Sequence, residues 1–318
     1  MIRIITLLQV FYNKFIMRSF WDNFSDIDDK FKTIGINDNT PIIEATYEGK
    51  NIFIKDENEN LNRSFKDRGV SYQMAKYLQL GNSNFALSSS GNSAISASFI
   101  TNHYDVKLQL FLSNNINSEK LEKINKFTNS KIEINLSDKP RSELIKFLNN
   151  NPEYINLRGS TDIYSYQGFK TISYELAEQV PDFDAIFIPC SSGTSTFGIY
   201  QGLKELNHLV PIHICQTEKV NALSKYFDVD YERQQSSLAD AITDRVAHRK
   251  DELIEIIKES EGFGWIISDS NLLEDKEIVN NLINKDYSFN SLLAFSGWRK
   301  SFEKGYNYKN PVLLFSGQ

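Results

Sequence analysis

Lys66 occupies an unusual position for a cation, because the sequence predicts that a helix begins beside it. Residues 62–69 read NRSFKDRG, in which Ser64 and Asp67 have the spacing of a capping box. Apolar residues then recur at four-residue intervals until Gly81, a typical helix stop. The partial positive charge at a helix N-terminus lowers the pKa of an amine, and a neutral amine is a nucleophile. Taken alone, the segment still favours a solvated surface lysine over a reactive one.

Two loops of small polar residues follow predicted strands, where ligands bind in α/β proteins. The loop SSSGNS at 88–93 could hold a carboxylate with its hydroxyls and the N–H groups of the next helix, although an ordinary turn is an equal alternative. The loop SSGTS at 191–195 could hold a phosphate, although its residues could also serve only as helix caps. It has neither Walker nor GxGxxG spacing, so a nucleotide is not favoured.

Other residues that could take part in catalysis or metal binding are less clearly indicated by the sequence. Ser316 follows an apolar strand, so its hydroxyl could lie in the same ligand site as the two loops. Strands also often end in Ser-Gly simply because the chain turns there. Cys190 is interpreted as a packing residue, because no neighbouring base is evident. We predict no metal site, because the histidines do not have the spacing of metal ligands; they are His103, His208, His213 and His248.

Short apolar runs alternate with helical patterns over most of the chain, which predicts an α/β fold with largely parallel sheets and crossover helices. A polar stretch near residue 150 is the best candidate for a domain boundary. The predicted strands cover 51–57, 84–88, 107–113, 131–137, 184–189, 212–217 and 311–317, and the predicted helices follow Ser64 and Ser93 and cover 117–127, 142–150 and 196–206.

Composition limits the possible functions. The chain has 318 residues, of which 41% are hydrophobic, so it can bury a substantial core. Its 35 basic and 41 acidic residues give a net charge of −6, which argues against nucleic acid and anionic membranes as partners. With only two cysteines, a reducing, cytoplasmic setting is expected. The apolar run 4–12 is interpreted as an amphipathic helix or an extension before Met17 rather than a signal peptide, and no run is long enough to span a membrane.

The order of these features resembles pyridoxal-phosphate enzymes of fold type II. In that order come the lysine of SFKDRG, a strand followed by SSSGN, a strand followed by a Ser/Thr/Gly loop, and a terminal LLFSG. Residues 58–69, NENLNRSFKDRG, are most similar to the threonine synthase branch, whose motif has Pro-Thr-Gly where this chain has Leu61, Asn62 and Arg63. Further similar segments are NTPIIEA, YQGFKTISYELAEQ, PIHICQTEKVNAL and SDSNLLEDKEI.

The resemblance implies two α/β domains, each a mostly parallel twisted sheet flanked by helices, with pyridoxal 5'-phosphate in the cleft between them. The smaller domain would cover 51–150, and the larger would cover 1–50 and 151–318. Lys66 would carry the cofactor in Schiff-base linkage, Asn92 would lie beside its ring hydroxyl, and Ser316 would contact its pyridine nitrogen. The phosphate cup would comprise Ser191, Ser192, Gly193, Thr194 and Ser195, and the substrate loop Ser88, Ser89, Ser90, Gly91, Asn92 and Ser93.

The implied activity is that of a lyase similar to threonine synthase, which converts phosphohomoserine to threonine and phosphate by γ-elimination and β-addition of water. Ser316 supports elimination or replacement chemistry, because a neutral hydroxyl keeps the cofactor ring a weaker electron sink than an aspartate would. Ser160 matches a substrate-binding position, but Ser165 lies where the family has a phosphate-binding arginine, and Arg158 is the candidate substitute.

Two other functions stay open at this stage. One is β-elimination or β-replacement on serine, threonine, cysteine or a phosphorylated amino acid, as in a dehydratase or a cysteine synthase. The other is a catalytically inactive paralogue that only binds. The expected partner is a small amino-acid substrate, and a homodimer is one assembly that the resemblance allows.

Overall fold

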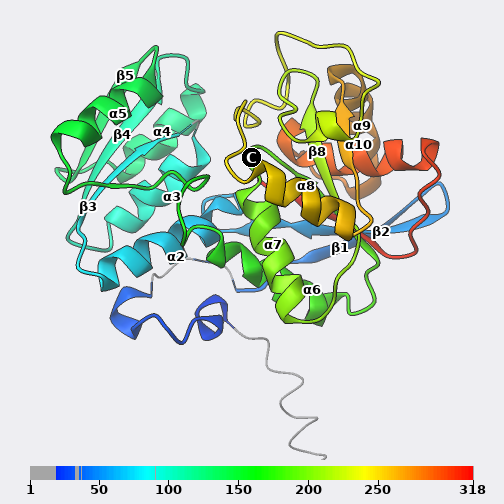
Figure 1. The fold of residues 1–318 in the computed structure, drawn as a ribbon, viewed down its shortest axis with the longest axis horizontal. Helices are drawn as coiled ribbons and strands as arrows, with labels where there is room; N and C mark the ends of the chain where they lie inside the picture. The colour runs from blue at the N-terminus through cyan, green and yellow to red at the C-terminus, as the bar shows by residue number, and fades with distance from the viewer. Residues whose placement is uncertain (1–18, 33–35, 37, 90, 318) are drawn as a thin grey trace, which may run out of the picture.

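The computed structural model describes residues 19–32, 36, 38–89 and 91–317, whose strands form two separate sheets. In Figure 1 the smaller sheet lies on the left and the larger one on the right. The predicted α/β class is confirmed, because nearly all strand pairs are parallel and helices flank both sheets. The predicted N-terminal helix, Met17 and Ser90 lie outside the described residues.

The larger sheet has six strands in the order β1-β2-β10-β7-β8-β9. Only β1 and β2 pair antiparallel, and their register places Ile43 opposite Ile54. The last strand of the chain, β10, lies in the middle of the sheet between β2 and β7 and is parallel to both. The strands are β1 (Ile42–Tyr47), β2 (Lys50–Asp56), β7 (Ala185–Pro189), β8 (Ile212–Thr217), β9 (Gly264–Ile267) and β10 (Pro311–Phe315).

The smaller sheet is parallel, with the order β5-β4-β3-β6. Its apolar residues face helices on both sides, with Leu87 and Leu110 toward α2–α4 and Ala86 and Phe111 toward α5. The elements are β3 (Asn84–Ser88), β4 (Lys107–Ser113), β5 (Ile132–Ser137), β6 (Ile155–Asn156), α2 (Lys66–Gln79), α3 (Asn92–Thr101), α4 (Ser118–Phe127) and α5 (Pro140–Asn150).

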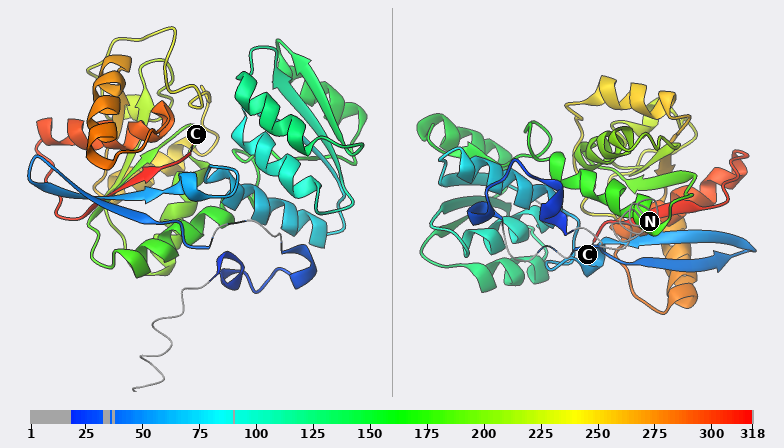
Figure 2. Two further views of the ribbon diagram at one scale, coloured as in Figure 1. Left: turned by 180° about the vertical axis from the view of Figure 1, so that it is seen from behind. Right: turned by 90° about the horizontal axis from the view of Figure 1, so that it is seen from below.

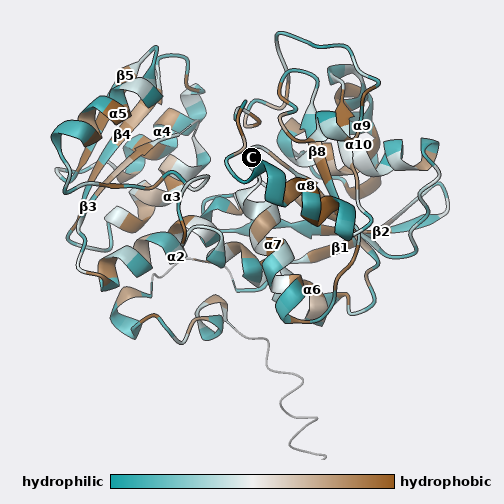
Figure 3. Ribbon diagram, viewed as in Figure 1, coloured by the Kyte–Doolittle hydropathy of each residue, from teal (hydrophilic) through white to brown (hydrophobic). Residues whose placement is uncertain are grey.

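The larger sheet has a separate core on each face, because side chains alternate along its strands. In β10, Val312 and Leu314 pack toward α6–α8, and Leu313 and Phe315 pack toward α9 and α10. Figure 3 shows the same pattern as hydrophobic strands beneath helices with hydrophilic outer faces. These helices are α6 (Lys170–Gln179), α7 (Thr194–Glu205), α8 (Lys250–Glu259), α9 (Asp269–Ile283) and α10 (Phe289–Glu303).

A segment before β1 packs against the outside of α2. Phe20, Phe24 and Ile27 form a small buried cluster with Tyr72 and Ala75 of that helix. In the left view of Figure 2 this segment lies below α2. The short 3-10 turns of the chain are Phe20–Asn23, Asp29–Phe31, Glu57–Glu59, Gln167–Phe169 and Ser224–Tyr226.

The expected boundaries at residues 51 and 150 do not coincide with the division between the sheets. Strand β2 falls in the predicted smaller domain but pairs with β1 and β10 in the larger sheet. Strand β6 falls in the predicted larger domain but pairs with β3 in the smaller sheet. Both strands lie where the chain passes between the sheets, so local pattern alone gives no indication of their partners.

The helix that carries Lys66 begins as predicted, but the predicted capping box is wrong. Phe65 holds the N-cap position, and its side chain makes no capping hydrogen bond. The Asp67 carboxylate accepts the backbone N–H of Asn62, at 2.9 Å, instead of that of Ser64. The Ser96 hydroxyl of α3 donates to its other oxygen at 2.6 Å, so Asp67 links α2 to α3. The stop at Gly81 is confirmed, since this glycine has φ of 87° and its N–H donates to Leu78.

Candidate active site

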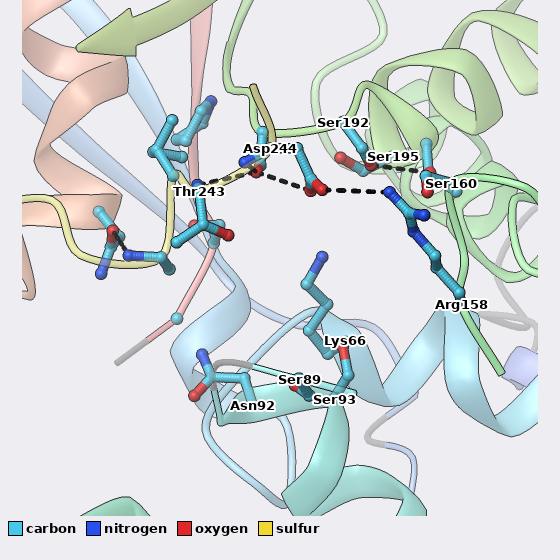
Figure 4. A pocket seen from close by; sticks show the side chains of 18 of the residues that line it. Lys66, Ser89, Asn92, Ser93, Arg158, Ser160, Ser192, Ser195, Thr243 and Asp244 are labelled. Carbon is cyan, nitrogen blue, oxygen red and sulfur yellow. Dashed lines mark hydrogen bonds and ion pairs between the residues drawn. The ribbon is translucent and has the colours of Figure 1, made fainter. Parts of the chain in front are cut away.

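A cavity of about 330 Å³ lies between the two sheets, at the carboxyl ends of β3, β4, β7 and β10. This volume is within the usual range for small-molecule sites, and the position is where open α/β sheets bind ligands. Figure 4 shows its interior. The predicted residues that line it are Lys66, Ser88, Ser89, Asn92, Ser93, Ser160, Ser191, Ser192, Gly193, Thr194, Ser195 and Ser316. Gly91 is not part of the lining.

The amine of Lys66 projects from the first turn of α2 into the middle of this cavity (Figure 4). Within the described part of the chain it makes no hydrogen bond or ion pair, and its nearest ring is Phe65, whose centroid is 4.8 Å away. Burial lowers the pKa of Lys66, while the negative charge of Asp244 partly opposes the shift. A lysine with a lowered pKa in a cavity has the properties of a nucleophile or a general base.

A buried cluster of charges fixes the helix that carries Lys66. The Arg68 guanidinium forms paired hydrogen bonds with Glu57, at 2.7 and 2.9 Å, and with Glu175, at 2.5 and 2.9 Å. Lys55 donates to the same Glu175 carboxylate at 2.5 Å. The two cations and two anions balance, and Arg68 and Glu57 are fully buried. The cluster joins α2 to β2 and α6, so it sets the position of the Lys66 backbone.

The hydroxyl of Ser64 connects three residues that the sequence predicts to act together. It donates to the backbone oxygen of Ser316 at 3.2 Å, and it accepts the backbone N–H of Lys66 and the side-chain amide of Asn92, both at 3.3 Å. The Ser316 hydroxyl itself makes no hydrogen bond to another described residue and lines the cavity. The structure therefore brings Lys66, Asn92 and Ser316 together through a residue that the sequence suggested only as a helix cap.

The loop after β3 has the backbone that an anion site requires. Gly91 has φ of 144°, and the helix α3 begins at Asn92 with its N-terminus toward the cavity. A side chain at Gly91 would also collide with Lys120 of α4, 2.5 Å from an added Cβ. The Lys120 amine lies 3.6 Å from the Asp240 carboxylate, so α4 is joined by an ion pair to the segment that follows β8.

The loop after β7 forms a cradle at the N-terminus of α7. Gly193 has φ of 85°, and an added Cβ would approach Leu253 to 2.2 Å, so a larger residue does not fit here. The hydroxyls of Ser192 and Thr194 are hydrogen-bonded at 3.1 Å. Exposed N–H groups at a helix N-terminus favour an anion, and hydroxyls add further donors. The predicted phosphate-binding residues are therefore together, in a suitable geometry.

Gln216, a fully buried residue of β8, holds this cradle in place. Its amide nitrogen donates to the backbone oxygens of Cys190 and Ser191, and its amide oxygen accepts the N–H groups of Leu223 and Ser224 at 2.8 Å. The amide group of Gln216 thus bonds only to backbone groups, and it holds the loop after β7 against the segment that contains Leu223 and Ser224. The sequence predicted the strand 212–217 but gave this residue no role.

Ser191 differs from the expected picture, because its hydroxyl binds a loop of the protein. It accepts the N–H groups of Thr243 and Asp244 and donates to the Asp244 carboxylate, each at 3.1 Å. Asp244 also forms ion pairs with Arg141, at 2.9 Å, and Arg158, at 3.8 Å. Arg141, Thr243 and Asp244 line the cavity but were missed, since Arg141 lies about a hundred residues from the other two and neither segment forms a motif.

Arg158 and Ser160 lie on the cavity wall opposite the substrate loop, as Figure 4 shows. Arg249 supports this stretch by donating to the backbone oxygens of Ser160, at 3.1 Å, and Asp162, at 2.7 Å. Ser165 does not line the main cavity; its hydroxyl donates to Gly159 at 2.9 Å. Arg158, the candidate substitute for the missing arginine, therefore does reach the site.

The remaining reactive residues belong to the core. Burial raises the pKa of Cys190 to about 12 and lowers that of His213 to about 3, so the thiol stays protonated and the imidazole neutral at physiological pH. The described residues contain no cluster of histidine, cysteine, aspartate and glutamate that could hold a metal ion. The described helices also include none that is long and apolar enough to cross a membrane.

The family model described as pyridoxal-phosphate dependent enzyme matches residues 35–278. The chain belongs to this family. A threonine synthase from Methanosarcina acetivorans is 27% identical over 164 residues, which cover 50% of this chain and 40% of that protein. The chain thus matches less than half the length of this curated relative.

Solved structures of pyridoxal-phosphate enzymes share the fold. Maize serine racemase aligns with a TM-score of 0.76 at 18% identity, covering 88% of each chain. A fungal L-serine ammonia-lyase from Rhizomucor miehei aligns with a TM-score of 0.75 at 18% identity, covering 89% of this chain and 95% of that one. Threonine deaminase isoform 2 from Solanum lycopersicum aligns with a TM-score of 0.72 at 17% identity, covering 94% of this chain and 88% of that one. The predicted fold type II architecture and cofactor are confirmed.

Proposed function

We propose that this pyridoxal-phosphate enzyme is a lyase similar to threonine synthase, acting on an amino acid whose side chain carries a second anionic group. The observation that carries this proposal is the pair of arginines, Arg141 and Arg158, on the cavity wall beside Ser160. Guanidinium groups are the preferred partners of phosphate and carboxylate oxygens. Phosphohomoserine, which carries a phosphate on its side chain, is the substrate that we infer.

The residues present fit the cofactor. The cradle of Ser192, Gly193, Thr194 and Ser195 would hold the phosphate, and the Gly193 position has no room for a side chain. Lys66 would bond to the aldehyde, Asn92 would lie beside the ring hydroxyl, and Ser316 would contact the ring nitrogen. When bound, pyridoxal phosphate supplies the electron sink for charge that develops at the substrate Cα.

The other steps belong to the protein. The N-terminus of α3 and the hydroxyls of Ser88, Ser89 and Ser93 would bind the α-carboxylate, which orients the Cα–H bond. Once the substrate displaces Lys66, the neutral amine of Lys66 would remove the Cα proton as a general base. Arg158 and Ser160 would then hold the side-chain phosphate as it leaves. The hydroxyl of Ser316 would leave the ring nitrogen unprotonated, which favours elimination over transamination.

A second candidate is an ammonia-lyase acting on serine or threonine. Asp244 supports it, because this carboxylate already pairs with both arginines and so reduces the charge available to a substrate anion. The fold shared with a serine ammonia-lyase and a threonine deaminase is compatible with this reaction. A third, an inactive binding paralogue, is less favoured because the Lys66 amine lies in the cavity without a partner among the described residues.

The test begins with the cofactor. We expect the purified protein to take up pyridoxal phosphate, to absorb visible light, and to lose that band on treatment with borohydride. Lys66→Ala abolishes the band, whereas Lys258→Ala, a change at an exposed lysine of α8, leaves it unchanged. A wild-type protein that never acquires the band would exclude the enzyme.

The loaded protein is then given phosphohomoserine, serine and threonine in separate reactions. Threonine and phosphate from phosphohomoserine would support the first candidate. Ammonia and a keto acid from serine or threonine, without phosphate release from phosphohomoserine, would replace it with the second. An intact chromophore without turnover of any of them would favour the inactive paralogue.

We also propose a cytoplasmic location and retain the homodimer as a prediction. Both cysteines, Cys190 and Cys215, are buried free thiols, which suits a reducing compartment. Size-exclusion chromatography with light scattering measures the assembly state.

A further inference from the structure

A second, smaller cavity of about 60 Å³ adjoins the main one at Lys66. The two cavities share Lys66, Ser93, Ser160, Ser192 and Thr194 in their walls. The remaining residues of the small cavity do not line the main one: Gly69, Val70, Gln73, Leu157, Gly159, Ser165 and Phe169. The proposed reaction gives roles to the shared residues but none to Gln73, which lines only the small cavity.

Two buried polar side chains in its wall have no protein partner. Gln73 is 1% exposed and Ser160 is 6% exposed. The amide nitrogen of Gln73 and the hydroxyl oxygen of Ser160 have no hydrogen-bond partner within the described chain. A buried donor or acceptor without a partner is costly, so nearly all such groups in folded proteins are satisfied by protein or by ordered water.

The size and chemistry of the cavity are right for water. One water molecule occupies about 30 Å³ in the liquid, so the cavity has room for about two. A buried water needs two to four polar partners. Gln73 provides a donor that no protein group uses, and the Ser160 hydroxyl can accept from a water while it donates to a substrate phosphate. Ser93 and Ser165 also line the same wall.

We propose that this cavity binds a pair of ordered water molecules, held by Gln73 and Ser160, that exchange protons with the amine of Lys66. The water site stands independently of the reaction, whereas its role as a proton relay rests on the proposed function. After Lys66 has taken a proton from Cα, its ammonium donates one proton to the adjacent water. That water releases a proton to the second water and onward to solvent. The amine is neutral again, and both waters keep their composition.

The water site is tested on the protein without cofactor, through Gln73→Met. If the cavity is hydrated, Gln73 is satisfied in the native protein. Methionine then removes a water ligand and leaves Ser160 without a partner, so the urea midpoint of unfolding falls. If the cavity is dry, the variant removes an unsatisfied amide and the midpoint rises, which overturns the proposal. Glutamine and methionine have similar helix propensities, so the comparison reports the cavity.

Gln201→Met is the matched control, because Gln201 lies in a helix, α7, and lines neither cavity. We expect it to leave the urea midpoint within error of the wild type. A crystal structure of the wild type gives the direct result. Two ordered waters within hydrogen-bonding distance of Gln73 and Ser160 support the site, and an empty cavity rejects it.

The relay is tested on the protein loaded with pyridoxal phosphate, in D₂O. We measure how much deuterium appears at Cα of recovered amino acid per turnover. Since the relay replaces the abstracted proton with one from solvent, Gln73→Met should reduce deuterium incorporation by about tenfold relative to the wild type and Gln201→Met. A hydrated cavity with unchanged incorporation would retain the water site and reject the relay. Failure of the wild type to bind the cofactor would instead reject the proposed function.

Discussion

The two ends of the active-site cavity are built from the same kinds of charged residue but in opposite ways. Beneath Lys66, Arg68 is buried and bound by two carboxylates, Glu57 and Glu175, which are also buried. At the far wall, Arg141 and Arg158 share the single carboxylate of Asp244, and their side chains are 54% and 22% exposed. The first arrangement has every charge compensated in one geometry, and the second leaves an excess positive charge near solvent.

This difference separates positioning from recognition. A buried charge that loses its partner is strongly destabilising, so the cluster at Arg68 permits only one position of α2. An exposed ion pair contributes little to stability and can exchange its partner for another anion. We therefore interpret the first region as the fixed support of the reactive amine and the second as the adaptable part of the site.

Removal of Arg68 should give the largest effect on stability. Arg68→Met leaves Glu57 and Glu175 buried with only Lys55 to compensate them, which should cost about 3–5 kcal/mol of unfolding free energy. Urea denaturation followed by circular dichroism measures this loss. Arg245→Met at an exposed position is the control. A loss below about 1 kcal/mol would show that the cluster is not the rigid support that we describe.

Loss of Arg158 should affect binding and leave stability nearly unchanged. Arg158→Gln removes the proposed charge-assisted partner of the substrate anion, and we expect KM for phosphohomoserine to rise by about ten- to a hundredfold, or about 1.5–3 kcal/mol. KM for serine should not change, since serine has no second anion. Steady-state kinetics on both substrates gives the comparison. Equal effects on the two would remove Arg158 from substrate recognition.

The pH dependence of stability should report the burial of Lys66. The pKa of Lys66 is lowered from 10.5 in the folded protein, so the unfolded chain binds more protons between the folded value and 10.5. This lysine therefore destabilises the cofactor-free protein, with the full effect below the folded pKa and none well above 10.5. Lys66→Met should raise the melting temperature at pH 7, and the gain should shrink as the pH rises toward 10. Differential scanning fluorimetry from pH 7 to 10 measures the difference in melting temperature between the variant and the wild type. A difference that does not change with pH would show that it comes from packing and not from the charge of Lys66.

The smallest effect is expected at the exposed pair. Arg141→Gln breaks an ion pair that is more than half exposed on the arginine side, so stability should change by less than about 1 kcal/mol. Because Asp244 then keeps only Arg158, KM for phosphohomoserine should rise less than in Arg158→Gln. A larger rise in KM in Arg141→Gln than in Arg158→Gln would show that Arg141, and not Arg158, is the main partner of the substrate anion.

Residues in strand-to-helix junctions could be predicted from the sequence because their signals are local. Lys66, Ser88 and Ser192 each belong to a short segment in which a hydrophobic run, small polar residues and a helical period occur in order. The strands β3, β4 and β8 were predicted with their observed bounds for the same reason. Their junctions converge at one edge of each sheet because the strands are parallel.

Features that depend on distant partners were not accessible in this way. Asp244 meets Arg141 across 103 residues of sequence, and either residue alone is an ordinary surface charge. The helix α10 was not predicted, because it is buried on most sides and has no polar face to give a helical period. Strand β6 has only two residues, too few for any pattern.

The central position of β10 has a consequence for biosynthesis. This strand fills the gap between β2 and β7, and the residue that follows it, Ser316, is hydrogen-bonded through Ser64 to the base of the Lys66 helix. Segments separated by more than 250 residues must therefore meet before the larger sheet is continuous. The larger sheet and the Ser64–Ser316 contact at the base of the Lys66 helix are therefore complete only once residues 311–316 have been synthesised and have joined the sheet.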